Sequence, residues 1–140
     1  MMRTLILALS LSAAAVAHAD DQDVIDYRRH IMHTMGEQIK ILGLIAEQRA
    51  PATSLATHAQ VLAITASTAK KAFEPHIDGG EAKPEVWAQW QDFSKRLDEL
   101  VAATAELSKT AKGNDVAAAA PKLKDLGCKS CHDTYRKPKT

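Results

Sequence analysis

The amino-acid sequence predicts an all-α fold, an antiparallel four-helix bundle formed by one domain. The chain has 140 residues, of which 46% are hydrophobic and 25% charged, and this is the composition of a single globular domain. Aromatic residues make up only 4% and alanines are abundant, which favours helix over sheet. Apolar residues recur at steps of three and four in four long segments, while no segment alternates as a strand would.

The first 19 residues are predicted to be a secretory signal peptide, so the bundle is expected to occupy residues 20–140. Arg3 gives a positive start, residues 4–16 are apolar or small, and Ala17-His18-Ala19 offers a small-x-small cleavage pattern. The apolar run is shorter than the roughly 20 residues that a membrane span needs, and no later stretch is long enough. We therefore expect export, to a bacterial periplasm, and no membrane span in the mature chain.

The first two helices are predicted over residues 23–48 and 54–73. The first has a continuous apolar face and is closed by Pro51. The second is rich in alanine and threonine, so its face is narrow and permits close packing. A loop with two consecutive glycines, residues 74–83, follows it.

The third and fourth helices are predicted over residues 84–112 and 116–137. Pro84 is a favourable first helical residue, and Gly113 ends the third helix, which has the most regular apolar stripe in the chain. Asn114 or Asp115 is available to cap the fourth helix. Because Pro121 lies inside that segment, the fourth helix is expected either to start late or to bend there.

The fourth segment contains the motif Cys128-Lys129-Ser130-Cys131-His132, the C-x-x-C-H attachment pattern of a c-type haem. Helical residues three apart lie on one face, so both thiols can add to one porphyrin. The next residue, His132, then has its imidazole beside the ring, where it can bind the iron.

Three other uses of these cysteines are weaker. A plain disulfide between them would leave His132 without a role. A thioredoxin-like redox pair belongs at a helix start in a βαβ unit, and no strand is predicted here. A zinc site needs a second ligand pair at suitable spacing, which the sequence lacks.

The position of this motif and its surroundings resemble the cytochrome c′ family, the class II cytochromes c. These proteins have C-x-x-C-H near the C-terminus of a secreted four-helix chain, and residues 128–137 resemble their C-terminal signature. Residues 79–87 resemble the family's glycine-rich loop and third-helix start, and Tyr27-Arg28 followed by Met32 resembles the start of its first helix. The resemblance spans the mature chain and implies one covalent haem c per chain.

Within this family, the resemblance assigns Met32 to the distal side of the haem. Typical members have a bulky apolar residue there and an iron open to small gases, whereas a low-spin branch has a methionine as sixth ligand. Residues 35–45 also resemble the low-spin branch, so Met32 is expected to bind iron opposite His132. By pattern alone, a methionine on an apolar helix face is more often core. Met35, one turn on, is the competing methionine and is expected to line the haem pocket or the core.

Three further side chains are expected near the haem, Arg28 and Trp87 because of the resemblance and Arg136 because of its spacing from His132. Arg28 lies four residues before Met32 on the same helix face and is expected to pair with a haem propionate, or else to be a solvated surface arginine. Arg136 follows His132 by four residues, near the proximal side or simply well placed at a helix C-terminus. Trp87 resembles a tryptophan packed near the haem, while Trp87 and Trp90 are equally suited to the core.

These assignments favour a periplasmic electron carrier. A thioether and an imidazole hold both oxidation states of iron with little geometric change. With both axial positions filled, no substrate can bind, so we expect no catalytic turnover. The alternative is a five-coordinate protein that binds nitric oxide or carbon monoxide, which requires Met32 to be unligated. A haem peroxidase would need a polar distal base, which the apolar residues around Met32 do not supply.

The charge balance excludes one class of partner and leaves others open. The chain has 18 Lys and Arg against 17 Asp and Glu, a net charge of +1, which excludes a general nucleic-acid binder. The expected partners are unidentified periplasmic redox proteins. The basic C-terminal segment, residues 121–140, is either a rim that steers an acidic partner or complementary to a helix dipole. Family members often pair through their first two helices, so a homodimer is plausible.

Overall fold

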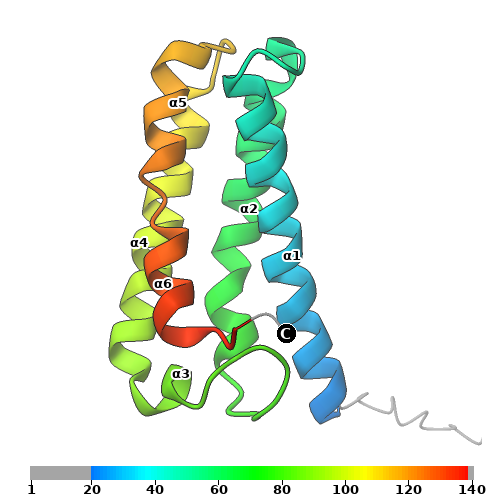
Figure 1. Ribbon diagram of the computed structural model, residues 1–140, viewed down its shortest axis with the longest axis vertical. Helices are drawn as coiled ribbons and strands as arrows, with labels where there is room; N and C mark the ends of the chain where they lie inside the picture. Colours follow the sequence, from blue (N-terminus) through cyan, green and yellow to red (C-terminus); the bar gives the residue numbers. More distant parts are fainter. Residues whose placement is uncertain (1–19, 139–140) are drawn as a thin grey trace, which may run out of the picture.

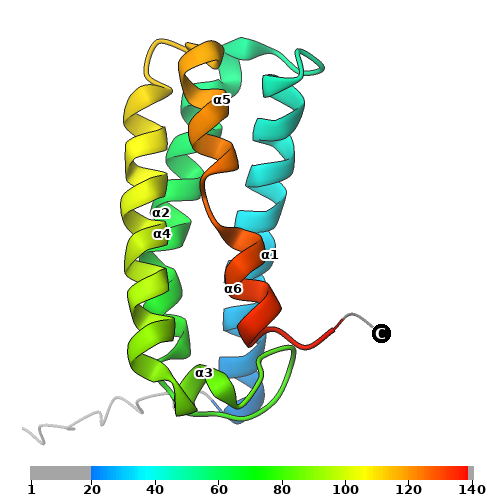
Figure 2. The same cartoon turned by 60° about the vertical axis from the view of Figure 1, so that its left-hand side comes forward.

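The computed structural model describes residues 20–138, which form a four-helix bundle (Figures 1 and 2). Its elements are α1 (Asp21–Ala46), the 3₁₀ turn η1 (Ala52–Ser54), α2 (Leu55–Phe73), α3 (Glu85–Ala88), α4 (Trp90–Thr110), α5 (Val116–Lys124) and α6 (Cys128–Tyr135). No strand occurs in this range, apart from one isolated bridge between Ala82 and Arg136. The predicted all-α bundle is confirmed, while the predicted signal peptide lies outside the described residues.

The fourth column of the bundle consists of two helices end to end, α5 above α6 (Figure 1). Helix α2 packs against α1 and α4, and α5 packs against α1 and α4 from the other side. Helix α6 packs closely on α3 and α4 but not on α1. The largest fully buried side chains come from α1 to α4 and are Leu42, Ile45, Leu62, Val86, Thr104 and Leu107. The fourth column adds the buried residues Ala119, Leu126 and Tyr135. The bundle is therefore tighter in its upper half, where α5 packs on α1, than between α1 and α6.

Helix α1 begins and ends two residues earlier than the predicted range. Asp20 caps it: its Oδ1 accepts a hydrogen bond from the Asp23 amide at 2.8 Å, and the Asp20 amide donates to Asp23 Oδ2 at 3.3 Å. At the other end, Gln48 has φ 58°, a left-handed conformation that stops the helix before Pro51. Helix α2 begins one residue later than predicted and ends as predicted, at Phe73.

The prediction of one continuous third helix from Pro84 is wrong, because the chain breaks at Gln89. This residue has φ −118° and ψ 40°, which separates the short α3 from α4. The break turns α3 under the end of the bundle (Figure 1). There the indole Nε1 of Trp87 donates to the carbonyl oxygen of Phe73 at 3.0 Å, and Val86 is fully buried. Contacts with α2 thus override the local helical pattern.

The fourth helix is also interrupted, but not at the predicted place. Pro121 lies inside α5, and the break comes after it, at residues 125–127. Gly127 has φ 68°, a left-handed conformation that glycine adopts without steric cost. Leu126, just before it, is buried. The interruption gives α6 its own start and places the cysteine motif in its first turn.

Candidate haem site

The two cysteines lie in the first turn of α6, at residues 128 and 131. Both are free and half-buried, and both pack against the hydrophobic core. The hydroxyl of Ser130 donates to the carbonyl oxygen of Gly127 at 2.8 Å and closes this turn. Burial raises the pKa of both thiols, so they are neutral in an apolar environment. The first turn therefore presents two thiols three residues apart against an apolar surface.

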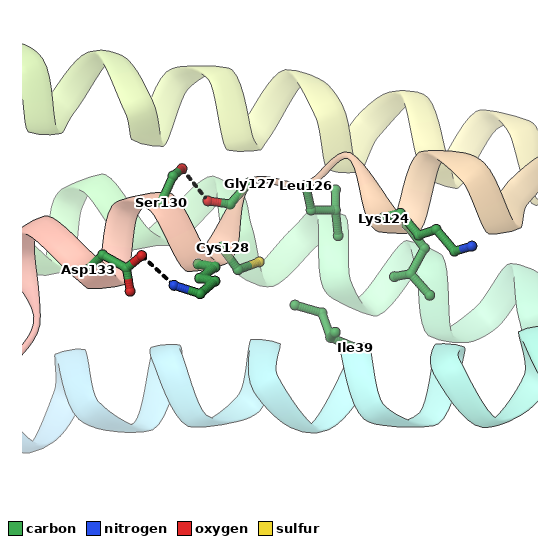
Figure 3. A pocket seen from close by; sticks show the side chains of 9 residues that line it. Ile39, Lys124, Leu126, Gly127, Cys128, Ser130 and Asp133 are labelled. Atoms are coloured by element: carbon green, nitrogen blue, oxygen red, sulfur yellow. Dashed lines mark hydrogen bonds and ion pairs between the residues drawn. The ribbon is translucent and has the colours of Figure 1, made fainter. Parts of the chain in front are cut away.

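A cavity of about 490 Å³ lies beside Cys128. Its wall includes Leu123 and Leu126 from the fourth column and Ile39 from α1. Figure 3 shows Ile39 on α1 across the space from Cys128 on α6. A second hollow of about 390 Å³ is lined by His132, Asp133, Arg136 and residues of the loop and C-terminal segment. Since Asp133 lines both, the two hollows follow one face of α6.

The opposite wall is formed by α1, where the two methionines differ in burial. Met35 is 4% exposed and belongs to the core, one of the two places expected for it. Met32 is only partly buried and packs against the same core, and neither methionine lines the two hollows along α6. Of the two thioethers, only that of Met32 is partly exposed.

Arg28 is buried, so the alternative of a solvated surface arginine is wrong. Only 3% of it is exposed, and its Nη2 donates to the carbonyl oxygen of Gly79 at 2.8 Å. Its guanidinium carbon lies 5.0 Å from the ring centroid of Trp87 and 5.7 Å from that of Phe73. Burial lowers its pKa, an effect that Asp78 opposes. Its Nη1 is buried without a hydrogen-bond partner, so the guanidinium can accept an anion as a ligand.

Trp87 lies beside Arg28 and is half-buried. Its ring stacks on His76, with centroids 4.9 Å apart. Trp90 lies 5.9 Å from the ring of Phe93 and packs against the core. Neither tryptophan lines the two hollows along α6.

Arg136 caps the C-terminus of α6 and lines the same hollow as His132. Its Nε donates to a carboxylate oxygen of Glu81 at 2.7 Å. The backbones join there too: the Lys83 amide donates to the Tyr135 carbonyl at 2.9 Å, and the Lys137 amide to the Glu81 carbonyl at 2.8 Å. The glycine-rich loop therefore holds both Arg28 on α1 and the segment after α6.

A polar cluster that the sequence analysis missed lies between α4 and α6. Tyr135 is buried, and its hydroxyl donates to Asp92 Oδ2, which also accepts from Arg96. The acid and the arginine four residues apart on α4 were a signal for a pair, but not for the contact with Tyr135. Elsewhere in residues 20–138, no group of three His, Cys, Asp or Glu residues could hold a metal ion.

The residues along this face fit a c-type haem. Two neutral thiols stand in one helical turn, and His132 follows them on a side of α6 that is hollowed. Apolar side chains from α1 and α5 line the space beside Cys128, as a porphyrin requires. The unpartnered Nη1 of Arg28 is an observation of a different kind, since a buried cationic donor without an acceptor fits a carboxylate such as a haem propionate.

A family model described as cytochrome C′ matches residues 23–136. The chain belongs to the cytochrome c′ family. The cytochrome c′ of Rhodospirillum rubrum is 30% identical over 145 residues, covering 97% of this chain and 99% of the relative. The cytochrome c-554 of Cereibacter sphaeroides is also 30% identical, covering 93% of this chain and 94% of that protein. The resemblance expected from the motif, the loop and the first helix is thus confirmed.

Solved structures of the cytochrome c′ family have the same fold. Ferric cytochrome c prime from Alcaligenes xylosoxidans matches with a TM-score of 0.80 and 28% identity, over 88% of this chain and all of that one. Another match, to the nitric oxide complex of a variant of the same protein, has a TM-score of 0.79 and 27% identity over 87% of this chain and 100% of that chain. As a cytochrome c′ family member the chain is a haem protein, and residues 128–132 have the spacing of a haem c attachment motif. In residues 20–138, no helix is long and apolar enough to cross a membrane.

Proposed function

We propose that this cytochrome c′ family protein is an electron carrier. Cys128 and Cys131 would hold one haem c per chain, and His132 and Met32 would supply its iron ligands. Haem iron supplies a reversible one-electron couple when bound. With both residues as ligands and water excluded, no substrate would have a place to bind, so no turnover is expected.

The observation that carries this proposal is the contrast between the two methionines of α1. Met35 is enclosed by the core, where its thioether has hydrocarbon neighbours. Met32 is only partly buried and packs against that core from its outer side. A thioether in this position can turn to a metal at no cost in core packing, because methionine is unbranched and flexible.

The remaining residues of the site bind and orient. We propose that the Nη1 of Arg28 donates to a haem propionate. Its Nη2 already donates to the carbonyl of Gly79, and the rings of Trp87 and Phe73 already lie against the guanidinium. Trp87 keeps the guanidinium in place from one side. Ile39 and Leu126 exclude water from the space beside Cys128. Arg136, held by Glu81, closes the end of α6 near His132.

We further propose that residues 1–19 direct export and that the mature protein, residues 20–140, works in the periplasm. The small-x-small sequence before Asp20 supports this proposal. Donor and acceptor proteins would meet the protein transiently. A homodimer through α1 and α2 remains part of this proposal, and the exposed side chains of Leu44, Val61 and Ile64 on these helices support it.

The test is an optical spectrum of the purified holoprotein, oxidised and reduced, with and without carbon monoxide. We expect a low-spin spectrum, a methionine-to-iron charge-transfer band in the oxidised form and no response to carbon monoxide. Met32→Ala should become high-spin and bind carbon monoxide, because its side chain no longer reaches the iron. The matched control Met35→Leu should keep the low-spin spectrum, since leucine conserves core volume.

The second candidate is a gas-binding protein with an open coordination position. It is favoured by the similarity to cytochrome c prime from Alcaligenes xylosoxidans, a ferrous variant of which has been solved with bound NO. In that case the untreated holoprotein would be high-spin and would respond to carbon monoxide. Met32→Ala would then leave the spectrum unchanged, and Met32 would only line the pocket.

A further inference from the structure

The polar cluster between α4 and α6 contains two opposite charges around a buried hydroxyl. Tyr135 is 3% exposed, and its hydroxyl donates to Asp92 Oδ2 at 2.5 Å. The Nε of Arg96 donates to the same oxygen at 2.7 Å, and its guanidinium carbon lies 5.6 Å from the centroid of the Tyr135 ring. Gln89 adds a contact of 3.3 Å to the hydroxyl. These three polar partners of Tyr135 come from α4 or the residue before it.

This cluster lies next to one of the two haem-attachment cysteines. Cys131 and Tyr135 are four residues apart in α6, so they share the face of α6 that packs on α4. On that face the hydroxyl of Tyr135 donates to Asp92, Arg96 donates to the same carboxylate oxygen, and the guanidinium of Arg96 lies over the Tyr135 ring. Both charges of the pair therefore lie against the face of α6 that includes Cys131.

We propose that Arg96 and Asp92 are positioning residues that set the midpoint potential of the haem attached at Cys131, Arg96 raising it and Asp92 lowering it. The inference rests on the proposed electron-carrier function. Adding one electron lowers the net charge of the site by one. A cation beside the site stabilises the reduced form, and an anion stabilises the oxidised form. Tyr135 fixes the distance of both charges because it joins Asp92 to α6.

The exposure of the pair allows this effect without a large cost in folding. About a third of the Arg96 side chain and half of Asp92 reach solvent, 34% and 49% respectively. Solvent therefore screens part of each charge, but the shared oxygen and the buried ring keep both in one arrangement. The two charges have opposite effects on the potential and lie at the same place. Removing either one therefore leaves the effect of the other uncompensated.

The experiment is a redox titration of the holoprotein followed by its optical spectrum. Arg96→Gln should lower the equilibrium constant for reduction, and Asp92→Asn should raise it, each by about threefold to tenfold for a partly screened charge near the site. A tenfold change is about 59 mV for one electron. Arg96→Lys keeps the charge and should stay near the wild-type potential. In the double variant, Arg96→Gln with Asp92→Asn, the two shifts should largely cancel.

The matched control is Lys109→Gln, which removes one positive charge from the same helix. Lys109 lies 13 residues beyond Arg96, or about 20 Å along α4, and is exposed. Its loss should leave the potential unchanged because of screening over that distance.

The proposal is overturned if the two single variants shift the potential in the same direction, or if the double variant keeps a shift as large as that of either single variant. Either result would mean that the pair acts only by holding α6 in place. A shift in Lys109→Gln as large as that in Arg96→Gln would equally overturn it. A holoprotein without any reversible one-electron couple would instead contradict the electron-carrier function itself.

Discussion

The buried arginine of α1 illustrates how one residue acquires a role through distant partners. Arg28 and Gly79 are 51 residues apart, yet the carbonyl of Gly79 fixes one guanidinium nitrogen and leaves the other without a partner. Gly79 has φ 135°, and a Cβ built there would meet Ile25 Cδ1 at 2.6 Å. The loop can approach α1 this closely only because the residue is glycine.

At the same scale, stability should depend on pH through Asp92. Hydrogen bonds from Tyr135 and then Arg96 hold the pKa of its carboxyl below the usual value of about 3.9. The folded protein therefore binds fewer protons than the unfolded chain in this window. The stabilisation is complete above the unfolded pKa and is lost as the pH falls through the lower folded pKa.

Denaturant unfolding of the holoprotein from about pH 6 down to about pH 2.5 measures this effect. Asp92→Asn should show a shallower loss of stability in acid than the wild type. Tyr135→Phe should also lose less stability in acid, since it removes the hydrogen bond that lowers the pKa of Asp92 most. The slope will not vanish, because the pKa of Glu37 is also lowered, by Lys40. Identical pH profiles for wild type and Asp92→Asn would refute the prediction.

The sequence predicted the residues of the site unevenly. The cysteine motif was readable because its chemistry depends only on spacing within one helix turn. Met32 and Arg28 were assigned by resemblance, and the burial of Arg28 depends on a loop that no local pattern announces. Glu81, the partner of Arg136, lies 55 residues from it and could not have been found by spacing.

Among the elements, the division of the fourth column into α5 and α6 decides where the haem motif points. Gly127 supplies the left-handed residue between them. Pro121 was the expected breaker, but it lies in the middle of α5, which continues past it to Lys124. Sequence periodicity locates a helix well, whereas its interruptions depend on what its ends contact.

Replacing Gly127 by alanine should destabilise the holoprotein by about 1–2 kcal/mol, the cost of a left-handed conformation for an L-residue. An added Cβ would meet only Ser130 Oγ at 3.7 Å, so the penalty comes from the backbone and not from a clash. Gly43→Ala is the matched control. Gly43 lies within α1 with nothing within 4 Å of a built Cβ. Gly43→Ala should therefore raise the free energy of unfolding by about 0.5–1 kcal/mol.

Chemical denaturation of both glycine variants provides the comparison. Opposite signs would support a backbone requirement at Gly127. If Gly127→Ala were neutral or stabilising, the break between α5 and α6 would not depend on the left-handed residue.

In the molecule as a whole, the packing is unequal along the bundle axis. In the upper half, α1, α2, α4 and α5 each pack on both of their neighbours. In the lower half, α6 does not pack closely on α1. The fold class could be predicted because four amphipathic stripes leave few other solutions. The difference in packing between the two halves could not be predicted, because it depends on where the fourth column divides. It also depends on the loop of residues 79–83, which joins α1 to the end of α6.

The same inequality predicts how the protein responds to loss of its haem. In the variant Cys128→Ser with Cys131→Ser, which cannot attach haem covalently, the partly buried apolar side chains of Ile39 and Leu123 have no covering group. Local opening is easiest where few apolar contacts hold an element. Amide hydrogen exchange should therefore accelerate most in residues 125–137 and in the first half of α1. Protection should persist in α2 and the upper half of α4, where Leu62 and Leu107 are fully buried. A uniform acceleration over all helices would mean instead that the haem stabilises the bundle as one cooperative unit, and that the upper half has no stability of its own.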